Sequence, residues 1–95
     1  MDIVNVERLR EFVKRHPDAG ASVRRWEAVV KESKWVSFRD VRNTFNTADY
    51  VNGKIVFDLG GNNYRMVTVA DFNGQQVIIR QVMTHAEYDK DRWRR

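Results

Sequence analysis

Side chains that can transfer protons and bind phosphate are concentrated in the second half of the chain. Histidine, tyrosine and lysine can move protons during a reaction. Arginine can hold a phosphate through two parallel hydrogen bonds and stabilise the charge that develops on it. The residues of these types are Lys54, Arg65, Arg80, His85 and Tyr88. This set suits RNA cleavage, in which the 2′-hydroxyl of the RNA attacks the neighbouring phosphate and no metal ion is required.

Other site chemistries find little support in the sequence. The chain has two histidines, His16 and His85, and no cysteine, so no cluster has the spacing of a metal site. The glycines of Gly60-Gly61-Asn62 are not followed by a Walker or dinucleotide-binding pattern. No serine or cysteine nucleophile motif is present. We therefore expect neither a metal ion nor a cofactor.

Three apolar runs, at 54–59, 64–70 and 76–83, predict a three-stranded antiparallel meander. The second turn contains Asn73-Gly74, a dipeptide favoured in two-residue type I′ hairpins, where both residues need positive φ. This turn would place the following residues opposite one another: Phe72 and Gln75, Val69 and Ile78, Val67 and Arg80, Arg65 and Val82.

The first turn, Gly60-Gly61-Asn62-Asn63, places Asp58 opposite Arg65 and Lys54 opposite Val69. Because side chains alternate between the faces of a strand, one face should carry Lys54, Asp58, Arg65 and Arg80. The other face should form the core with Ile55, Phe57, Leu59, Met66, Ile79 and Met83. A shift of one residue would exchange the two faces.

Helical periodicity precedes these strands. The first helix should follow an N-cap at Asn5 and stop near His16, since the residue before proline disfavours the α conformation. A second helix should begin at Pro17, and a short third one should end near Asn43. Residues 1–4 suit an edge strand, 46–53 a polar loop and 85–93 a short C-terminal helix. The order predicts one α+β domain, residues 1–95, with two to three N-terminal helices packed on one face of a small antiparallel sheet.

Composition agrees with a folded domain that acts on acidic partners. Hydrophobic residues make up 42% of the chain, and the charged 32% is well mixed, which argues against disorder. The net charge of +4 favours nucleic acid or another acidic partner. Neither a membrane-spanning run of about 20 apolar residues nor a signal peptide is present, so we expect a soluble cytoplasmic protein without a membrane partner.

Each candidate also has a structural explanation. Arg65 could pair with Asp58, His85 could cap a strand end, Tyr88 could only pack its ring, and Lys54 could protect a strand edge. Two other functions therefore remain open. One is a non-catalytic module that binds RNA or the ribosome through a basic sheet face. The other is an interaction domain whose arginines dock an acidic protein.

The stretches 57–65 and 79–89 resemble the HigB family of toxin–antitoxin toxins. The shared pattern is a Gly-Asn turn followed by an arginine, an arginine on the last strand, and then Thr-His-x-Glu-Tyr-Asp, which this chain has at 84–89. The N-terminal half is similar too, at Leu9, the His16-Pro17 corner, Trp26, Trp35 and Ala48-Asp49. The likeness covers nearly the whole chain.

That resemblance implies a RelE-like fold and an mRNA endonuclease that stops translation, usually by cutting mRNA on the ribosome. It also implies a helix-turn-helix antitoxin partner of the HigA type and a toxin–antitoxin hetero-oligomer.

The matching positions carry over as hypotheses about individual residues. His85 would act as general acid or base, Arg65 and Arg80 would bind the phosphate, and Tyr88 would position a base or share the proton transfer. Asp89 would orient a neighbour, and Asn62 would contact RNA or serve the turn. Outside the matching positions, we expect Lys54 and Arg92 to contact RNA. Asp58 stands where relatives often have asparagine, so it would lower activity if it neutralised Arg65. Alanine at either arginine should abolish cleavage with little loss of fold, because an open face tolerates truncation.

Overall fold

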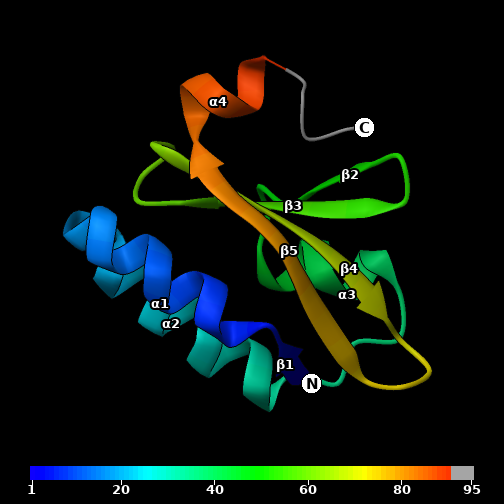
Figure 1. Ribbon diagram of the computed structural model, residues 1–95. Coiled ribbons are helices and arrows are strands. Elements are labelled where there is room, and N and C mark those ends of the chain that lie inside the picture. The colour runs from blue at the N-terminus through cyan, green and yellow to red at the C-terminus, as the bar shows by residue number, and fades with distance from the viewer. Residues whose placement is uncertain (91–95) are drawn as a thin grey trace.

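The computed structural model describes residues 1–90 of the chain. Four α-helices, a short 3₁₀ helix and five strands follow one another along it (Figure 1). Their order is β1 (Asp2–Val4), α1 (Val6–Arg15), η1 (Pro17–Ala19), α2 (Gly20–Glu32), α3 (Phe38–Thr44), β2 (Asp49–Val51), β3 (Lys54–Leu59), β4 (Tyr64–Asp71), β5 (Gln76–Thr84) and α4 (His85–Asp89). The α+β class expected from the sequence is confirmed. Within the described residues no helix is long and apolar enough to cross a membrane.

The strands form one sheet in the order β1-β5-β4-β3-β2. The meander of β3, β4 and β5 is antiparallel, and the N-terminal strand β1 adds in parallel beside β5. Strand β2 lies inside the segment predicted to be a loop, so that prediction is wrong there. Its three residues pair with the start of β3 and make it the second edge of the sheet.

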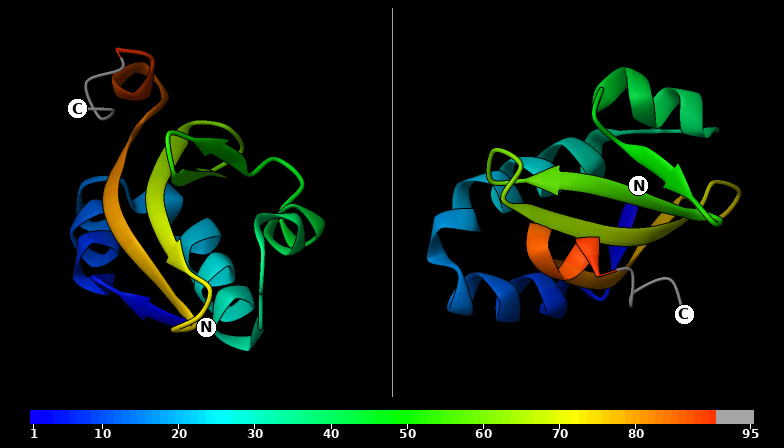
Figure 2. Two further views of the ribbon diagram at one scale, coloured as in Figure 1. Left: turned by 90° about the vertical axis from the view of Figure 1, so that its right-hand side faces the viewer. Right: turned by 90° about the horizontal axis from the view of Figure 1, so that it is seen from above.

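The main core lies between one face of the sheet and the helices α1, α2 and α3, which gather on that face (Figure 2). Apolar side chains at helical spacing supply the helical half, including Leu9, Phe12, Val23 and Trp26. Ile55, Phe57, Leu59, Met66 and Ile79 supply the sheet half, as predicted. Helix α1 ends at Arg15, so the prediction of a stop before Pro17 is confirmed.

The second hairpin differs from its prediction. Asn73 and Gly74 do not have positive φ; Gln75 does, at 55°, and the last strand pair is Asp71 with Gln76. The Asp71 carboxylate accepts a hydrogen bond from the Gly74 N–H and stabilises this longer turn. The predicted type I′ turn and the pairing of Phe72 with Gln75 are therefore wrong.

A β-bulge in β5 makes the rest of the observed register differ from the predicted one. The pair of Val69 and Ile78 is confirmed, but Thr68 faces Ile79, the register then shifts, and Val67 faces Gln81. Arg80 is the extra residue, so the predicted pairs of Val67 with Arg80 and Arg65 with Val82 are wrong; Arg65 faces Met83. A bulge resets the alternation of side chains beyond it. For this reason Met83, predicted in the main core, packs instead with Val56 and Val67 on the opposite face.

Candidate active site

The turn between β3 and β4 forms one side of the site. Gly60, Gly61 and Asn62 all have positive φ, at 59°, 60° and 85°. A Cβ atom on Gly60 would lie 2.8 Å from the Tyr64 ring, so only glycine fits there. The Tyr64 hydroxyl in turn donates to the Asp18 carboxylate at 2.8 Å, a hydrogen bond that raises the pKa of Tyr64. The turn is thus held against the end of α1 and η1.

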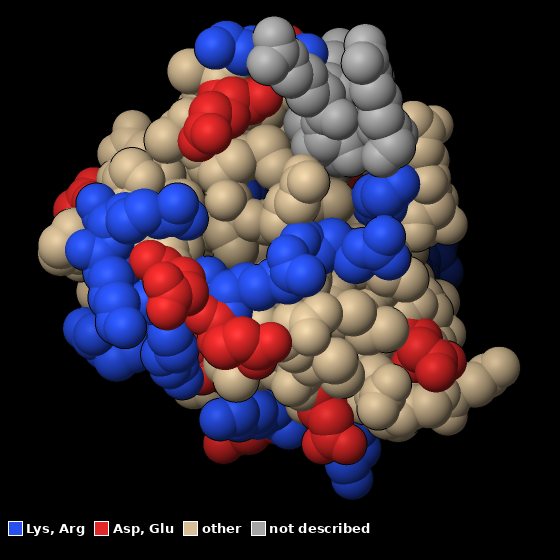
Figure 3. Space-filling model, viewed as in Figure 1, with Lys and Arg blue, Asp and Glu red and all other residues tan. Residues whose placement is uncertain are grey.

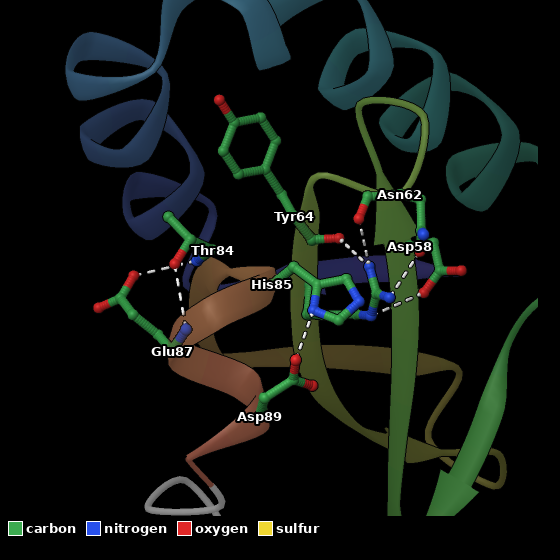
Figure 4. Close-up of polar contacts among 8 residues, drawn as sticks. Asp58, Asn62, Tyr64, Thr84, His85, Glu87 and Asp89 are labelled. Atoms are coloured by element: carbon green, nitrogen blue, oxygen red, sulfur yellow. Dashed lines mark hydrogen bonds and ion pairs between the residues drawn. The ribbon is translucent and has the colours of Figure 1, made fainter.

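Arg65 is the most heavily bonded side chain of the site. Its Nε lies 3.1 Å from the Asp58 carboxylate, and Nη1 donates to the Asn62 and Tyr64 carbonyls at 3.0 Å each. Nη2 donates to the Asn62 side-chain oxygen at 2.6 Å. Figure 4 shows these contacts converging from Asp58, Asn62 and Tyr64. The hydrogen bonds use three of the five guanidinium N–H groups, Nε lies beside the Asp58 carboxylate in an ion pair, and one N–H on Nη2 is left for a substrate.

The environment of Arg65 corrects one expectation. Asp58 lies opposite Arg65 and pairs with it, as the register predicted. However, Arg65 is only 9% exposed and does not lie on an open, truncation-tolerant surface. Its removal would leave the partly exposed Asp58 carboxylate and two backbone carbonyls without their partner. The expectation that alanine at Arg65 costs little stability does not fit this geometry.

Helix α4 begins at the other side of the site through a capping box. The Glu87 N–H donates to the Thr84 hydroxyl at 3.2 Å, and the Glu87 carboxylate accepts from the Thr84 N–H at 3.0 Å. The hydrogen bond from the Thr84 backbone is the main cause that lowers the pKa of Glu87. The His85 N–H then donates to the Asn63 carbonyl at 2.9 Å. The first residue of α4 is therefore fixed directly to the glycine-rich turn.

His85 is oriented within its own helix. Its Nδ1 lies 2.9 Å from the Asp89 carboxylate, one helical turn later, and the side chain is 42% exposed. This contact uses Nδ1 and leaves Nε2 to exchange a proton with a substrate. A carboxylate that holds one nitrogen of a partly exposed imidazole is an arrangement suited to general acid–base catalysis.

Tyr88 joins α4 to the sheet. Its ring packs against the small cluster of Val56, Val67 and Met83, and the Arg65 guanidinium carbon lies 5.7 Å from the ring centroid. A cation at this distance from an aromatic face is attracted to it. The structure therefore brings five predicted site residues together, with Asp58 beside them: Asn62, Arg65, His85, Tyr88 and Asp89.

The remaining predicted residues lie elsewhere. Arg80 is exposed at the bulge, and Lys54 is half-buried at the start of β3, four residues before Asp58 and so about 13 Å from it along the strand. On the face of the molecule seen in Figure 3, lysine and arginine side chains form a band across the middle. Arg92 falls outside the described residues. Within residues 1–90, no group of three or more His, Asp or Glu side chains is placed to hold a metal ion.

A groove beside α4 was missed by the sequence interpretation. It has a volume of about 560 Å³ and is lined by residues of α1, of the end of β5 and of α4. Its lining combines both signs of charge with two apolar side chains and consists of Glu7, Arg8, Glu11, Arg15, Gln81, Val82, Met83, Glu87 and Lys90. The charged residues of α1 look like an ordinary solvent-facing stripe in the sequence, so no local signal could have pointed to this groove.

The capping box makes a testable prediction for α4. Glu87→Ala should shift the helix–coil equilibrium of residues 85–89 about fivefold toward the coil, because a lost cap costs ~1 kcal/mol. Glu87→Gln should retain the helix, since its side-chain oxygen can still accept from Thr84. The pKa of Glu87 is lowered in the folded state, so its contribution is present above the unfolded pKa and is lost as pH falls through the folded pKa.

The ¹³Cα chemical shifts of residues 85–89, followed from neutral to acidic pH, measure this effect. The wild type should lose helical shifts on acidification, whereas Glu87→Gln should not lose them at that step. Equal acid sensitivity in the two proteins would contradict the role given to the Glu87 carboxylate.

Comparison with known proteins gives consistent matches. A family model described as HigB_toxin, RelE-like toxic component of a toxin-antitoxin system, matches residues 19–91. The chain is 28% identical over 93 residues to the mRNA interferase HigB of Escherichia coli O6:H1, an alignment that covers 95% of this chain and 90% of the relative. It is 26% identical over 92 residues to the mRNA interferase toxin HigB of Escherichia coli K12, covering 94% and 88%. The mRNA interferase HigB of Shigella flexneri matches equally.

Proposed function

The chain belongs to the HigB family of RelE-like toxins, the toxic components of toxin–antitoxin systems, and on that premise we propose that it cuts mRNA and so stops translation. The relatives that match along nearly the whole chain are named mRNA interferases. The observation that carries the proposal is the pairing of His85 with Asp89 beside Arg65 and Tyr88. This cluster combines a proton-transfer group with a phosphate-binding cation.

The reaction is an attack of the RNA 2′-hydroxyl on the adjacent phosphorus. A general base takes the hydroxyl proton, the new P–O bond closes a 2′,3′-cyclic phosphate, and the bond to the 5′-oxygen breaks. A general acid protonates the leaving oxygen, which becomes a 5′-hydroxyl. His85 serves as one of these two groups through Nε2, while Asp89 orients its ring. Tyr88 positions a base or takes part in the proton transfer.

The two arginines have different parts in this proposal. Arg65 offers one N–H and a positive charge that Asp58 partly balances. Arg80 is exposed, and its guanidinium forms no ion pair with the other described residues, so it can bind the phosphate bidentately. Asn62, whose side-chain oxygen is already bound to Arg65, has its amide N–H groups left for RNA. Lys54 and Arg92 add contacts to the RNA backbone.

Membership in a toxin–antitoxin family implies an antitoxin partner and an mRNA substrate. We further propose that the antitoxin is a helix-turn-helix protein of the HigA type that forms a hetero-oligomer with this chain. The substrate would be mRNA bound to the ribosome, and the site of action the cytoplasm.

The decisive test is mRNA cleavage in a purified translation system, mapped by primer extension. Breaks at defined codon positions, with 5′-hydroxyl and 2′,3′-cyclic phosphate ends, are expected. Ends that carry a 5′-phosphate would rule out the 2′-hydroxyl mechanism. The same assay on naked RNA measures dependence on the ribosome. Intact mRNA together with salt-sensitive ribosome binding would support a non-catalytic binding module instead.

A further inference from the structure

The bulge in β5 determines which residues reach the active site. Before it, Ile79 belongs to the main core; after it, Met83 lies on the opposite face beneath Tyr88. Without the extra residue, strict alternation would return Met83 to the main core and would turn Thr84, the N-cap of α4, to the other face. The placement of His85 and Tyr88 over Arg65 therefore depends on the bulge.

The N-cap residue and the first turn of α1 bind the bulge directly. The Asn5 side-chain amide donates to the Ile79 carbonyl at 3.1 Å, and Arg8 Nη1 donates to the Arg80 carbonyl at 3.0 Å. Strand β1 pairs with β5 only as far as Val4 and Ile78. The Asn5 and Arg8 side chains thus bind the edge of β5 just beyond the residues that pair with strand β1.

These two hydrogen bonds distinguish a bulged strand from a regular one. In a regular strand, successive carbonyl groups point to opposite edges. Here the carbonyls of two successive residues, Ile79 and Arg80, accept from the N-cap residue and the first turn of α1, and so point to the same edge. A strand without the bulge could not satisfy both donors, so this pair stabilises the bulged register over the regular one.

The side chain of Asn5 does not cap the helix. Asn5 is the N-cap residue of α1, as predicted, and its carbonyl accepts from the Arg8 N–H at 3.0 Å, but its side chain makes no capping hydrogen bond. Its backbone has φ 70° and ψ 36°, a left-handed conformation that asparagine tolerates better than most residues. That conformation brings the amide to Ile79.

We propose that Asn5 and Arg8 are positioning residues of the active site, which hold the β5 bulge and thereby place α4, with His85 and Tyr88, over Arg65. Neither residue touches the reacting atoms in this assignment. The effect on cleavage rests on the proposed function, whereas the effect on strand register does not.

Substitutions at both positions can remove the donor, or replace it with a shorter and uncharged one, and leave most of the local chemistry unchanged. Asn5→Asp keeps the size and the tolerance for positive φ but has no N–H to donate. Arg8→Gln removes the guanidinium from an exposed position of α1. Arg39→Gln, at an exposed position of α3, is the matched control for the loss of one positive charge.

Methionine methyl groups labelled with ¹³C report the register without any activity assay. Met83 lies beyond the bulge on the site face, and Met66 lies in the main core. Asn5→Asp and Arg8→Gln should change the chemical shift of the Met83 methyl group and leave that of the Met66 methyl group unchanged. In the cleavage assay, kcat should fall about tenfold with a smaller change in KM, since small misplacements of reacting groups cost rate. Arg39→Gln should change neither.

Unchanged Met83 signals and unchanged kcat in both variants would overturn the proposal. Equal displacement of the Met66 and Met83 signals would also overturn it, because the two residues would then support the whole fold and not the bulge. If the wild-type protein cuts no mRNA, the proposed function is wrong, but that result does not contradict the role of Asn5 and Arg8 in the strand register. The methyl signals then still decide whether Asn5 and Arg8 hold the register.

Discussion

His85→Ala is expected to lower the rate of mRNA cleavage by about 10²–10⁴-fold, the usual contribution of a general acid or base. The side chain is 42% exposed, and among residues 1–90 the observed ion-pair partner of its ring is Asp89, at Nδ1. Asp89→Asn should cause a smaller loss, because the imidazole remains but loses its charged partner. Cleavage rates from primer extension, with thermal unfolding measured in parallel, separate catalysis from stability.

The other histidine of the chain supplies the control. His16 packs against Phe12 and Tyr64, with ring centroids 4.5 Å and 5.1 Å away, at the end of α1. His16→Ala should weaken this packing and lower the thermal midpoint, yet it should retain cleavage. If His85→Ala cut mRNA as fast as the wild type, His85 would have no part in proton transfer and the site assignment would have to be abandoned.

Arg65→Ala is expected to affect both stability and cleavage. Removing one partner of a buried ion pair costs about 3–5 kcal/mol; because Asp58 is 28% exposed, we expect roughly 3 kcal/mol in the free energy of unfolding. The lost hydrogen bonds would also release the Asn62 and Tyr64 carbonyls and so loosen the turn that binds His85. Urea denaturation and primer extension measure the two effects.

Arg80→Ala is the matched comparison. Its side chain is exposed, so its unfolding free energy should change by less than about 0.5 kcal/mol. Cleavage should nevertheless be lost if Arg80 binds the phosphate. If Arg65→Ala had the same free energy of unfolding as the wild type, the observed contacts around the Arg65 guanidinium would not stabilise the fold.

Local patterns in the sequence were sufficient for much of this fold. Alternation along β3 and the glycine-rich turn placed Asp58 opposite Arg65, and helical spacing placed Leu9 and Phe12 in the core. These inferences depend on neighbours within a few residues. The Thr-His-x-Glu-Tyr-Asp pattern and the family resemblance identified α4 and its histidine.

The features that were missed depend on contacts between distant residues. The bulge at Arg80 involves Asn5 and Arg8, more than seventy residues earlier in the chain. No alternation within β5 could reveal it, so Met83 was assigned to the wrong face. Likewise, the burial of Arg65 follows from the packing of Tyr88 and from the shape of the turn, which its own strand does not specify.

The sheet separates two apolar clusters of very different size. The one between sheet and helices includes three tryptophan and phenylalanine pairs, whereas the one beneath α4 consists of Val56, Val67 and Met83 with Val51 and Tyr88 at its margin. Free energies of local opening follow such differences in buried contacts. Amide hydrogens of α4 should therefore exchange with solvent through local openings, while those of central β4 exchange only when the whole molecule unfolds. Helix α4, which carries His85, can thus detach and return many times during the lifetime of one folded molecule.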